Sequence, residues 1–262
     1  MPEGDTIFRT AESVRRWING RTVTAARTTA PVPVRLLVGS EVTAVEARAK
    51  HLLFRFSNGL VLHTHMRMTG SWHVYPTGDR WQRPRSQARL VLECGDRTAV
   101  CFNAPVIELL DPQQEATHAS LVGLGPDVLD GSFDMDEVVR RARRCPPETT
   151  AGELLLDQRV VSGIGNIYRC ESLFLEGLDP WATVGSIGDD RLRHLVAGAC
   201  RIMRANVAAQ TTMTRQFGAG GPWVYRQSGR PCRRCGTTVR GSRLGEQGRS
   251  IFWCPTCQPP AG

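Results

Sequence analysis

Cys232-Arg233-Arg234-Cys235 and, after eighteen intervening residues, Cys254-Pro255-Thr256-Cys257 decide the fold at the C-terminal end of this 262-residue chain. Two Cys-x-x-Cys pairs at this spacing are typical of two knuckles that share one tetrahedral zinc ion. Four thiolates leave no ligand position open for water, so the predicted zinc is structural, and so small a segment needs the metal to fold. Disulfide pairing is the alternative, but an odd total of nine cysteines argues against a disulfide framework.

Arginine surrounds these knuckles. Seven arginines lie from Arg226 to Arg249, and Glu246 is the only acidic residue after Arg215. The whole chain has a formal net charge of +8 and a pI near 9.3. This charge balance fits a polyanionic partner, and we expect the arginine-rich segment to lie on nucleic-acid phosphates.

Lysine is nearly absent from this chain. The 33 basic residues include a single lysine, Lys50, and every other one is arginine. Arginine is always charged, whereas the pKa of lysine moves readily, which suits proton transfer or Schiff-base chemistry. Lys50 is therefore a candidate functional residue. The alternative is codon bias in a GC-rich genome, which would leave a stray lysine anywhere.

The N-terminal part of the chain is predicted to be one helix followed by β structure. A helix is predicted over residues 4–19, with an apolar face made by Ile7, Ala11, Val14 and Ile18. Hairpins are predicted around Ser57-Asn58-Gly59 and around Gly95-Asp96, within a strand-rich region from about residue 22 to 110. This part is therefore predicted to be a β-rich domain with one terminal helix.

Helical periodicity takes over after residues 111–133, which glycines and prolines mark as an interdomain linker. Helices are predicted at residues 134–144, 150–161, 166–176 and 189–208, and a mobile loop at 209–222. The turn Ser162-Gly163-Ile164-Gly165-Asn166 separates two of these helices. Free N–H groups at the following helix start, with the Asn166 side chain, predict a phosphate site. An ordinary helix-turn-helix corner is the alternative.

Several motifs, taken together and in order, resemble the Fpg/Nei DNA glycosylases, and the endonuclease VIII (Nei) branch more than formamidopyrimidine-DNA glycosylase (Fpg). The motifs are Met1-Pro2-Glu3-Gly4, Glu46-Ala47-Arg48-Ala49-Lys50, His65-Met66-Arg67-Met68-Thr69-Gly70, Gly125-Pro126-Asp127-Val128-Leu129, Leu155-Leu156-Asp157-Gln158 with Gly163 to Tyr168, and the ribbon Arg249 to Cys257. The resemblance implies an α+β multidomain fold. It consists of an N-terminal β-sandwich with a catalytic helix (1–118), a helix–two-turn–helix domain (119–224) and a C-terminal zinc ribbon (225–262).

The resemblance also implies base-excision repair by a bifunctional DNA glycosylase and AP lyase. Removal of Met1 would expose the secondary amine of Pro2, which attacks C1′ of the damaged nucleotide, forms a Schiff base and leads to β/δ-elimination. Glu3 is the expected proton-transfer group, and Lys50 then becomes a phosphate-positioning and proton-handling group. The family usually has a glutamate where this chain has Thr6, preceded by Asp5. Either Asp5 compensates, or lesion handling differs.

DNA contacts are expected from His65, Arg67, Met68, Asn166 and Arg249. By resemblance, Met68 is the wedge that fills the space left by the flipped nucleotide, and Arg67 and Met66 beside it are candidate partners for the orphaned base. Core packing is the alternative for Met68. The Arg-Phe pair that Fpg enzymes carry on a later loop is absent from residues 103–108, which favours oxidised pyrimidines as substrates. His63 and His65 lie on one strand face, but no third ligand is near in sequence, so a phosphate or core role is preferred over a metal site.

The expected ligands and partners are one structural Zn²⁺ held by Cys232, Cys235, Cys254 and Cys257, and damaged DNA. We expect a monomer in the cytoplasm of a bacterium, associated with the nucleoid, because the sequence shows no apolar membrane span and no targeting segment. Two other functions remain open. One is a lyase for abasic or single-stranded DNA with weak base excision. The other is a non-enzymatic zinc-ribbon DNA-binding protein.

Overall fold

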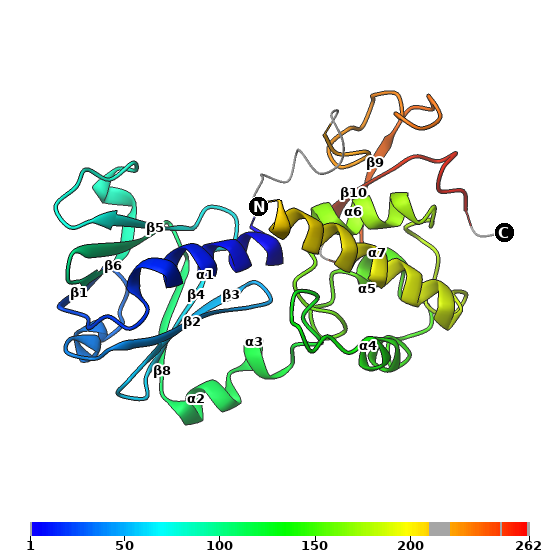
Figure 1. The fold of residues 1–262 in the computed structure, drawn as a ribbon. Coiled ribbons are helices and arrows are strands. Elements are labelled where there is room, and N and C mark those ends of the chain that lie inside the picture. The colour runs from blue at the N-terminus through cyan, green and yellow to red at the C-terminus, as the bar shows by residue number, and fades with distance from the viewer. Residues whose placement is uncertain (1, 210–220, 247, 261–262) are drawn as a thin grey trace. The chain divides into compact units, whose positions relative to one another are not determined.

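The computed structural model describes residues 2–209, 221–246 and 248–260 and divides into two compact units, Met1–Val122 and Gly123–Gly262 (Figure 1). Unit 1 holds the first helix and two sheets. Unit 2 holds the remaining long helices and the cysteine-rich ribbon. Most of the loop predicted at 209–222 lies outside the described residues.

Unit 1 begins with helix α1 (Gly4–Ile18), as predicted. Its apolar face is fully buried, and the buried set includes Ile7, Ala11, Val14 and Ile18. The chain leaves the helix through Gly20, whose φ of 74° lies in the left-handed region that glycine enters without strain. The amphipathic pattern therefore places one face of α1 against the sheets.

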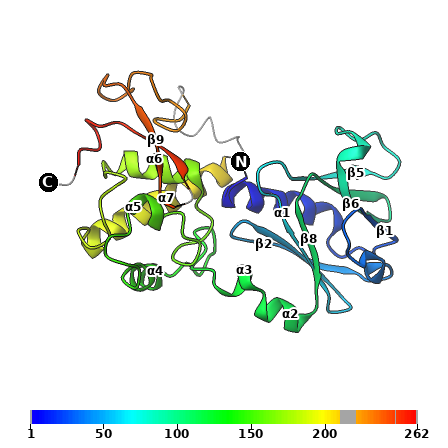
Figure 2. The same ribbon diagram turned by 180° about the vertical axis from the view of Figure 1, so that it is seen from behind.

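Two four-stranded antiparallel sheets form a sandwich in unit 1 (Figures 1 and 2). The first has the order β1-β6-β7-β5, with β1 at Ala25–Thr28, β5 at Ser71–Pro76, β6 at Ala88–Cys94 and β7 at Arg97–Phe102. The second has the order β2-β3-β4-β8, with β2 at Val42–Arg48, β3 at His51–Phe56, β4 at Val61–His65 and β8 at Val106–Leu110. Both predicted hairpins are present, as β3–β4 and β6–β7.

The interdomain linker predicted at 111–133 contains the boundary between the two units, after Val122, but its first half is helical. Helices α2 (Pro112–Thr117) and α3 (Ala119–Val122) occupy it. A capping box between Asp111 and Gln114 starts α2, and the guanidinium of Arg55 on β3 binds the Glu115 carboxylate with two bonds of 2.9 and 3.0 Å. Docking on the sheet, rather than hydrophobic periodicity, therefore stabilises these short helices.

Unit 2 contains α4 (Met135–Ala142), α5 (Ala151–Leu154), α6 (Asn166–Leu175) and α7 (Asp189–Ala208). The helix predicted over 150–161 is present only as α5, which ends at Leu154, so the prediction of helix over 155–161 is wrong. Beyond α5 the backbone bonds to the segment before α4: Gly125 N–H donates to Gln158 O at 2.8 Å, and Ser162 N–H donates to Pro126 O at 2.9 Å. These contacts between distant segments replace the helical bonds that the local sequence would otherwise make.

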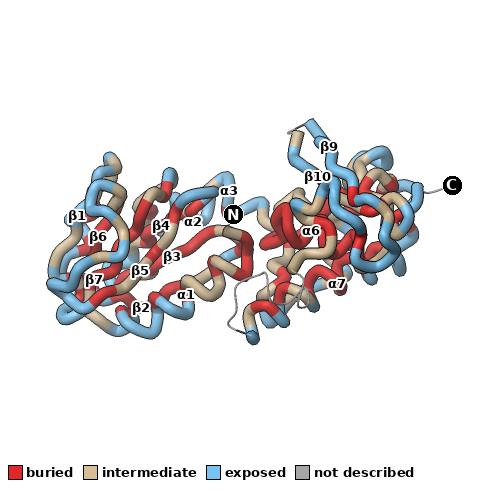
Figure 3. Tube along the Cα trace, turned by 90° about the horizontal axis from the view of Figure 1, so that it is seen from above, coloured by how far each residue is buried: buried red, intermediate tan, exposed pale blue. Residues whose placement is uncertain are grey.

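The ribbon has two strands, β9 (Arg240–Leu244) and β10 (Arg249–Trp253), paired antiparallel. Val239, Ile251 and Cys254 share one core cluster with the helices of unit 2, and α6 is buried along almost all of its length (Figure 3). The three-domain division with boundaries at 118 and 224 stays a prediction. Among the described helices, none combines the length and apolar character needed to cross a membrane.

Candidate active site

Glu3 stands immediately before α1, and its side chain is fully buried. Its carbonyl oxygen accepts the N–H groups of Thr6 and Ile7 at 3.0 and 3.1 Å, which closes the first helical turn. Pro2 precedes it and is half-buried, while Met1 lies outside the described residues. The predicted nucleophile and its acidic neighbour are therefore held at a helix N-terminus, where the backbone dipole is positive.

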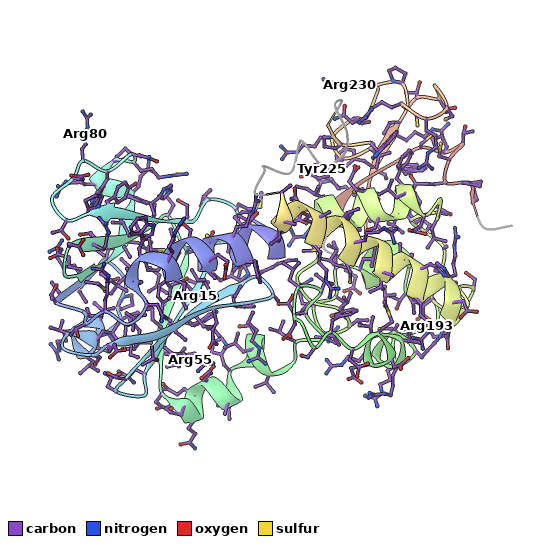
Figure 4. All side chains as sticks on the ribbon, in the orientation of Figure 1. Arg15, Arg55, Arg80, Arg193, Tyr225 and Arg230 are labelled. Atoms are coloured by element: carbon purple, nitrogen blue, oxygen red, sulfur yellow. The ribbon has the colours of Figure 1, made fainter. Side chains whose placement is uncertain are left out.

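Two contacts show how α1 lies on β2. Gly20 N–H donates to Val42 O at 2.8 Å, and the Arg15 guanidinium, labelled in Figure 4, donates to Val45 O at 2.7 and 2.9 Å. The helix therefore runs antiparallel to the strand. Helix α1 begins eleven residues before Arg15, a rise of about 16 Å, and β2 continues three residues from Val45 to Arg48, about 10 Å, before the turn at Ala49 and Lys50. The start of α1 and the Lys50 turn consequently lie at the same end of unit 1 (Figures 1 and 2).

The loop after β4 lies at this end too, because His65 is paired with His51, the residue that follows Lys50. His65 Nδ1 accepts the Arg67 N–H at 3.1 Å, and Arg67 has a φ of 47°. Met68 is 59% exposed, so the core-packing alternative for this residue is wrong. Met66, which the sequence offered as a partner for the orphaned base beside Arg67, is instead buried at 1% exposure.

The neighbouring loop contains Asn103, whose carbonyl oxygen accepts the Thr69 hydroxyl at 3.3 Å. Asn103 itself has a φ of 51°, and its side-chain amide donates to Gln87 at 3.1 Å. Neither arginine nor phenylalanine occurs at positions 103–108. The loop that lies against the Met68 loop therefore lacks large wedge side chains.

Asp5 and Thr6 lie where this chain departs from the family pattern, which usually has a glutamate at position 6. The Asp5 carboxylate is buried and pairs with Arg9 at 3.2 Å, whereas Thr6 is half-buried. A carboxylate engaged by an arginine one helical turn away is poorly placed to act in place of a glutamate at position 6.

Three histidines lie on the face of the second sheet beside Lys50. Burial lowers the pKa of His51 to about 3, and burial together with the charges of Arg67 and Lys50 lowers the pKa of His65 to about 4. The pKa of His63 is also lowered by burial. These rings are therefore neutral at physiological pH.

The sequence offered no third metal ligand beside His63, and here the structure differs. Strand pairing places Glu108 of β8 opposite His63, and His118 from the end of α2 completes a group whose ligand atoms all lie within 4.8 Å of one another. Glu108 is the single polar residue of β8, and this is the only sequence signal for it. No sequence signal points to His118, because its position beside His63 and Glu108 depends on how α2 packs against the sheet.

In unit 2, Asn166 and the residue after Arg249 are joined through one backbone carbonyl. The Asn166 side-chain amide donates to Ser250 O at 2.8 Å, and the fully buried Arg169 donates to the same oxygen at 2.7 Å and to the Asn166 side-chain oxygen. Arg249 is exposed. The N-terminus of α6 and the start of β10, which carry the two predicted phosphate contacts of this unit, are therefore held together.

The turn before α6 is organised by Gln158. Its amide donates to Leu156 O and Ile164 O at 2.9 and 3.0 Å, and its side-chain oxygen accepts the Gly163 N–H at 3.1 Å. Gly163 has a φ of 96°, which favours glycine. A pocket of about 470 Å³ beside the turn is lined by residues that include Gln158, Arg169 and Arg249.

The four ribbon cysteines gather as predicted. The sulfur atoms of Cys232 and Cys257 lie 3.9 Å apart, those of Cys235 and Cys254 lie 3.5 Å apart, and all four lie within 4.8 Å of one another. Tetrahedral Zn–S bonds of about 2.3 Å separate neighbouring sulfurs by about 3.8 Å. The donor set and its spacing therefore fit one zinc ion.

Comparison with known proteins agrees with this fold. Residues 1–105 match the formamidopyrimidine-DNA glycosylase N-terminal domain, and residues 124–217 match the H2TH domain of the same glycosylase. Solved structures of similar fold include a Lactococcus lactis Fpg bound to DNA containing an abasic site, with a TM-score of 0.83, 20% identity, and coverage of 98% of this chain and 100% of the other. The chain belongs to the Fpg/Nei family of DNA glycosylases.

Within that family, endonuclease 8 proteins are among its relatives. A probable endonuclease 8 2 of Streptomyces coelicolor is 39% identical, over 98% of this chain and 94% of the relative. A DNA-(apurinic or apyrimidinic site) lyase, Nei2, of Mycolicibacterium smegmatis is 34% identical, over 98% of this chain and 99% of the relative. An endonuclease 8 of Escherichia coli is 35% identical, over 98% of this chain and 100% of the relative.

Proposed function

We propose that this DNA glycosylase and AP lyase removes oxidised pyrimidines from DNA and uses the N-terminal amine of Pro2 as its nucleophile. The observation that carries the proposal is the antiparallel docking of α1 on β2. It brings the start of α1, the Lys50 turn and the Met68 loop to one end of unit 1. An amine, a carboxylate and an ammonium group are the set that glycosidic cleavage followed by elimination requires.

The amine of Pro2 is suited to attack at neutral pH. A free α-amino group titrates near pH 7.7 to 8.0, roughly two and a half units below lysine, and the positive end of a helix lowers its pKa further. The unprotonated amine attacks C1′, the base departs, and the nitrogen forms an iminium with the opened sugar. The iminium acidifies the C2′ proton, and its loss expels the 3′ phosphate. A second elimination releases the 5′ phosphate.

Glu3 and Lys50 supply protons and charge in this scheme. Glu3 is next in sequence to the amine, so its carboxyl group can protonate the sugar oxygen as the ring opens and take up protons afterwards. Lys50 is a compact cation on a tight turn and can hold a phosphate oxygen beside the reacting sugar. Burial of Glu3 in unit 1 supports a role that depends on exclusion of water.

The remaining predicted residues would hold the DNA. Exposed Met68 fills the space of the extruded nucleotide, and Arg67 and His65 contact the strand beside it. Asn166 and Arg249, joined through Ser250, contact backbone phosphates. The absence of arginine and phenylalanine at positions 103–108 supports oxidised pyrimidines over 8-oxoguanine.

We also infer that the four ribbon cysteines hold one structural zinc ion, which positions the ribbon arginines. No step of the chemistry passes through the metal. The proposed state is a monomer on the bacterial nucleoid, since the relatives named above are bacterial and damaged chromosomal DNA is the proposed substrate.

Borohydride trapping tests the nucleophile and the substrate together. The purified protein is incubated with oligonucleotides that carry an abasic site, thymine glycol or dihydrouracil, and the complexes are separated and digested. We expect covalent complexes with all three, with the DNA attached to the peptide that begins at Pro2. Absence of any complex, or full activity of a protein whose intact mass retains Met1, would contradict the Pro2 mechanism.

A second function is favoured by one observation. Thr6 replaces the family glutamate, and the nearby Asp5 carboxylate pairs with Arg9, so base excision would be weak while the lyase step is retained. The same experiment separates the two functions, because a lyase with weak excision is trapped on abasic DNA alone.

A further inference from the structure

Four of the six histidines gather in unit 1. His51 and His65 are cross-strand partners on β3 and β4, and His63 is paired with Glu108 on β8. The ring of His118, at the end of α2, lies 5.1 Å from the ring of His63. Of these side chains, only His65 has a role in the proposed function, as a DNA contact.

Glu108 connects two of these rings. One of its carboxylate oxygens lies 2.7 Å from His63 Nδ1 and 3.1 Å from His118 Nε2. Bonds of about 2.0 to 2.2 Å from a cation to nitrogen and oxygen separate tetrahedral ligand atoms by about 3.3 to 3.5 Å. A cation would therefore fit between the three atoms once the shortest of these separations, from His63 Nδ1 to Glu108, opens by about 0.6 to 0.8 Å. Two imidazoles and one carboxylate are a donor set that zinc, cobalt and nickel accept.

Each imidazole in this group also has a partner at its other nitrogen. His63 Nε2 lies 2.8 Å from His51 Nδ1, and His118 Nδ1 lies 3.1 Å from the Ser120 hydroxyl. Metal-binding histidines in proteins are usually oriented by such a second hydrogen bond, which fixes the ring and selects the nitrogen that faces the metal. An isolated surface histidine lacks this support.

The His63–Glu108–His118 group is buried on one side and reaches solvent on the other. His63 is 1% exposed, whereas the side chains of His118 and Glu108 are 18% and 42% exposed, so a hydrated cation can enter from the Glu108 side. Helix α2, which carries His118 at its end, is held on β3 by the Arg55–Glu115 pair, and Figure 4 labels Arg55 beside α2. Arg55 also binds Glu46 at 3.0 Å, so its charge is matched by two carboxylates.

We propose that His63, Glu108 and His118 form a second metal site, which binds one divalent transition cation of the zinc class and leaves a position for water. The bound cation links α2 and β8 to the centre of the second sheet. His51 lies between the cation and the Lys50 turn, because it contacts His63 and directly follows Lys50 in sequence. This site is independent of the ribbon cysteines and of the proposed glycosylase chemistry.

Cobalt titration of untagged protein tests the proposal. The protein is first given one equivalent of zinc, which the four ribbon thiolates bind in preference, so that added Co²⁺ reports on other sites. We expect one further equivalent of Co²⁺ to bind, with weak visible bands of nitrogen and oxygen ligands and without the intense thiolate charge-transfer band. Binding should also raise the melting temperature, because the cation binds the folded state alone. Uptake of the ribbon's metal only would overturn the proposal.

Two variants locate the site. His118→Ala removes a ligand that lies at the end of a short helix, and Glu108→Gln keeps the shape of the side chain but removes its charge. Each should lower Co²⁺ affinity at least tenfold and abolish the melting shift. His194→Ala, at an exposed position on α7, is the matched control and should bind Co²⁺ like the parent protein. If both ligand variants bind Co²⁺ as well as the control does, the cation is held elsewhere and the assignment is wrong.

Discussion

At the level of single residues, the proposed chemistry depends on Glu3, whose side chain is fully buried. We expect Glu3→Gln to lower base excision by about 10² to 10⁴-fold, the range of general acid–base catalysis, while trapping on abasic DNA persists, because there the base has already left. Single-turnover excision assays alongside borohydride trapping measure the two steps. Glu12→Gln, an exposed position on the same helix, is the control and should leave both unchanged. An equal loss in both variants would mean that the effect is not specific to the Glu3 carboxylate.

Lys50 differs from every other basic residue of this chain in being a point charge. Lys50→Arg keeps the charge but replaces a compact ammonium with a planar fork, so DNA affinity should change little while base excision falls more than abasic-strand cleavage. Binding titrations and cleavage assays on thymine-glycol and abasic duplexes distinguish these effects. Arg48→Lys, an exposed change two residues away, should behave like the parent protein. Normal excision by Lys50→Arg would show that the lone lysine is codon bias.

Met66 and Met68 are separated by one residue and have opposite environments, at 1% and 59% exposure. Met68→Ala should leave stability within about 0.5 kcal/mol, as for most surface changes, but weaken binding to lesion-containing duplex. Met66→Ala should instead cost about 2 to 5 kcal/mol, as for buried large-to-small substitutions. Urea unfolding and binding titrations of the two variants provide the comparison. Loss of stability in Met68→Ala would argue against a wedge and for packing.

At the scale of secondary structure elements, α2 shows how a docked helix can escape detection by periodicity. Arg55 holds the pKa of Glu115 below its ordinary value of 4.5. Because the pKa is lower in the folded state, the stabilisation is fully present above the ordinary pKa and is lost as the pH falls through the lowered one. We expect Glu115→Gln to cost about 1 kcal/mol near neutral pH, as for a partly buried two-bond pair, and nearly nothing in acid.

Urea unfolding of the parent protein and of Glu115→Gln, near neutral pH and again well below the ordinary carboxyl pKa, measures this difference. Glu41→Gln changes an exposed carboxylate on the same unit and should show little effect at either pH. A stability difference for Glu115→Gln that does not shrink in acid would mean that the ion pair is not its cause.

For the whole molecule, the ribbon and the helices of unit 2 form one core, so loss of the zinc should extend beyond the ribbon. Cys254→Ser should lose the metal and weaken DNA binding, and it should destabilise unit 2, because Cys254 and Ile251 are fully buried in the shared core. Metal analysis, thermal unfolding and salt-dependent DNA binding test this. Cys145→Ser, a cysteine outside the cluster, should keep the zinc. Stoichiometric zinc and normal DNA binding in Cys254→Ser would count against the site.

The sequence by itself determined the features that depend on near neighbours in the chain. Apolar spacing predicted α1, glycine-containing turns predicted both hairpins, and cysteine spacing predicted the ribbon cluster. The order of the motifs was enough to predict the family. Each of these signals is local, because helix period, turn geometry and knuckle spacing are satisfied within a few residues.

Only the tertiary structure decided which distant residues meet. The early end of α5, the docking of α2, and the His63–Glu108–His118 group all depend on pairings between segments far apart in sequence. The same holds for the approach of the Lys50 turn to the start of α1, which follows from the direction in which α1 lies on β2. Strand register and helix docking are determined by the packing of the whole unit, so no local pattern could reveal them.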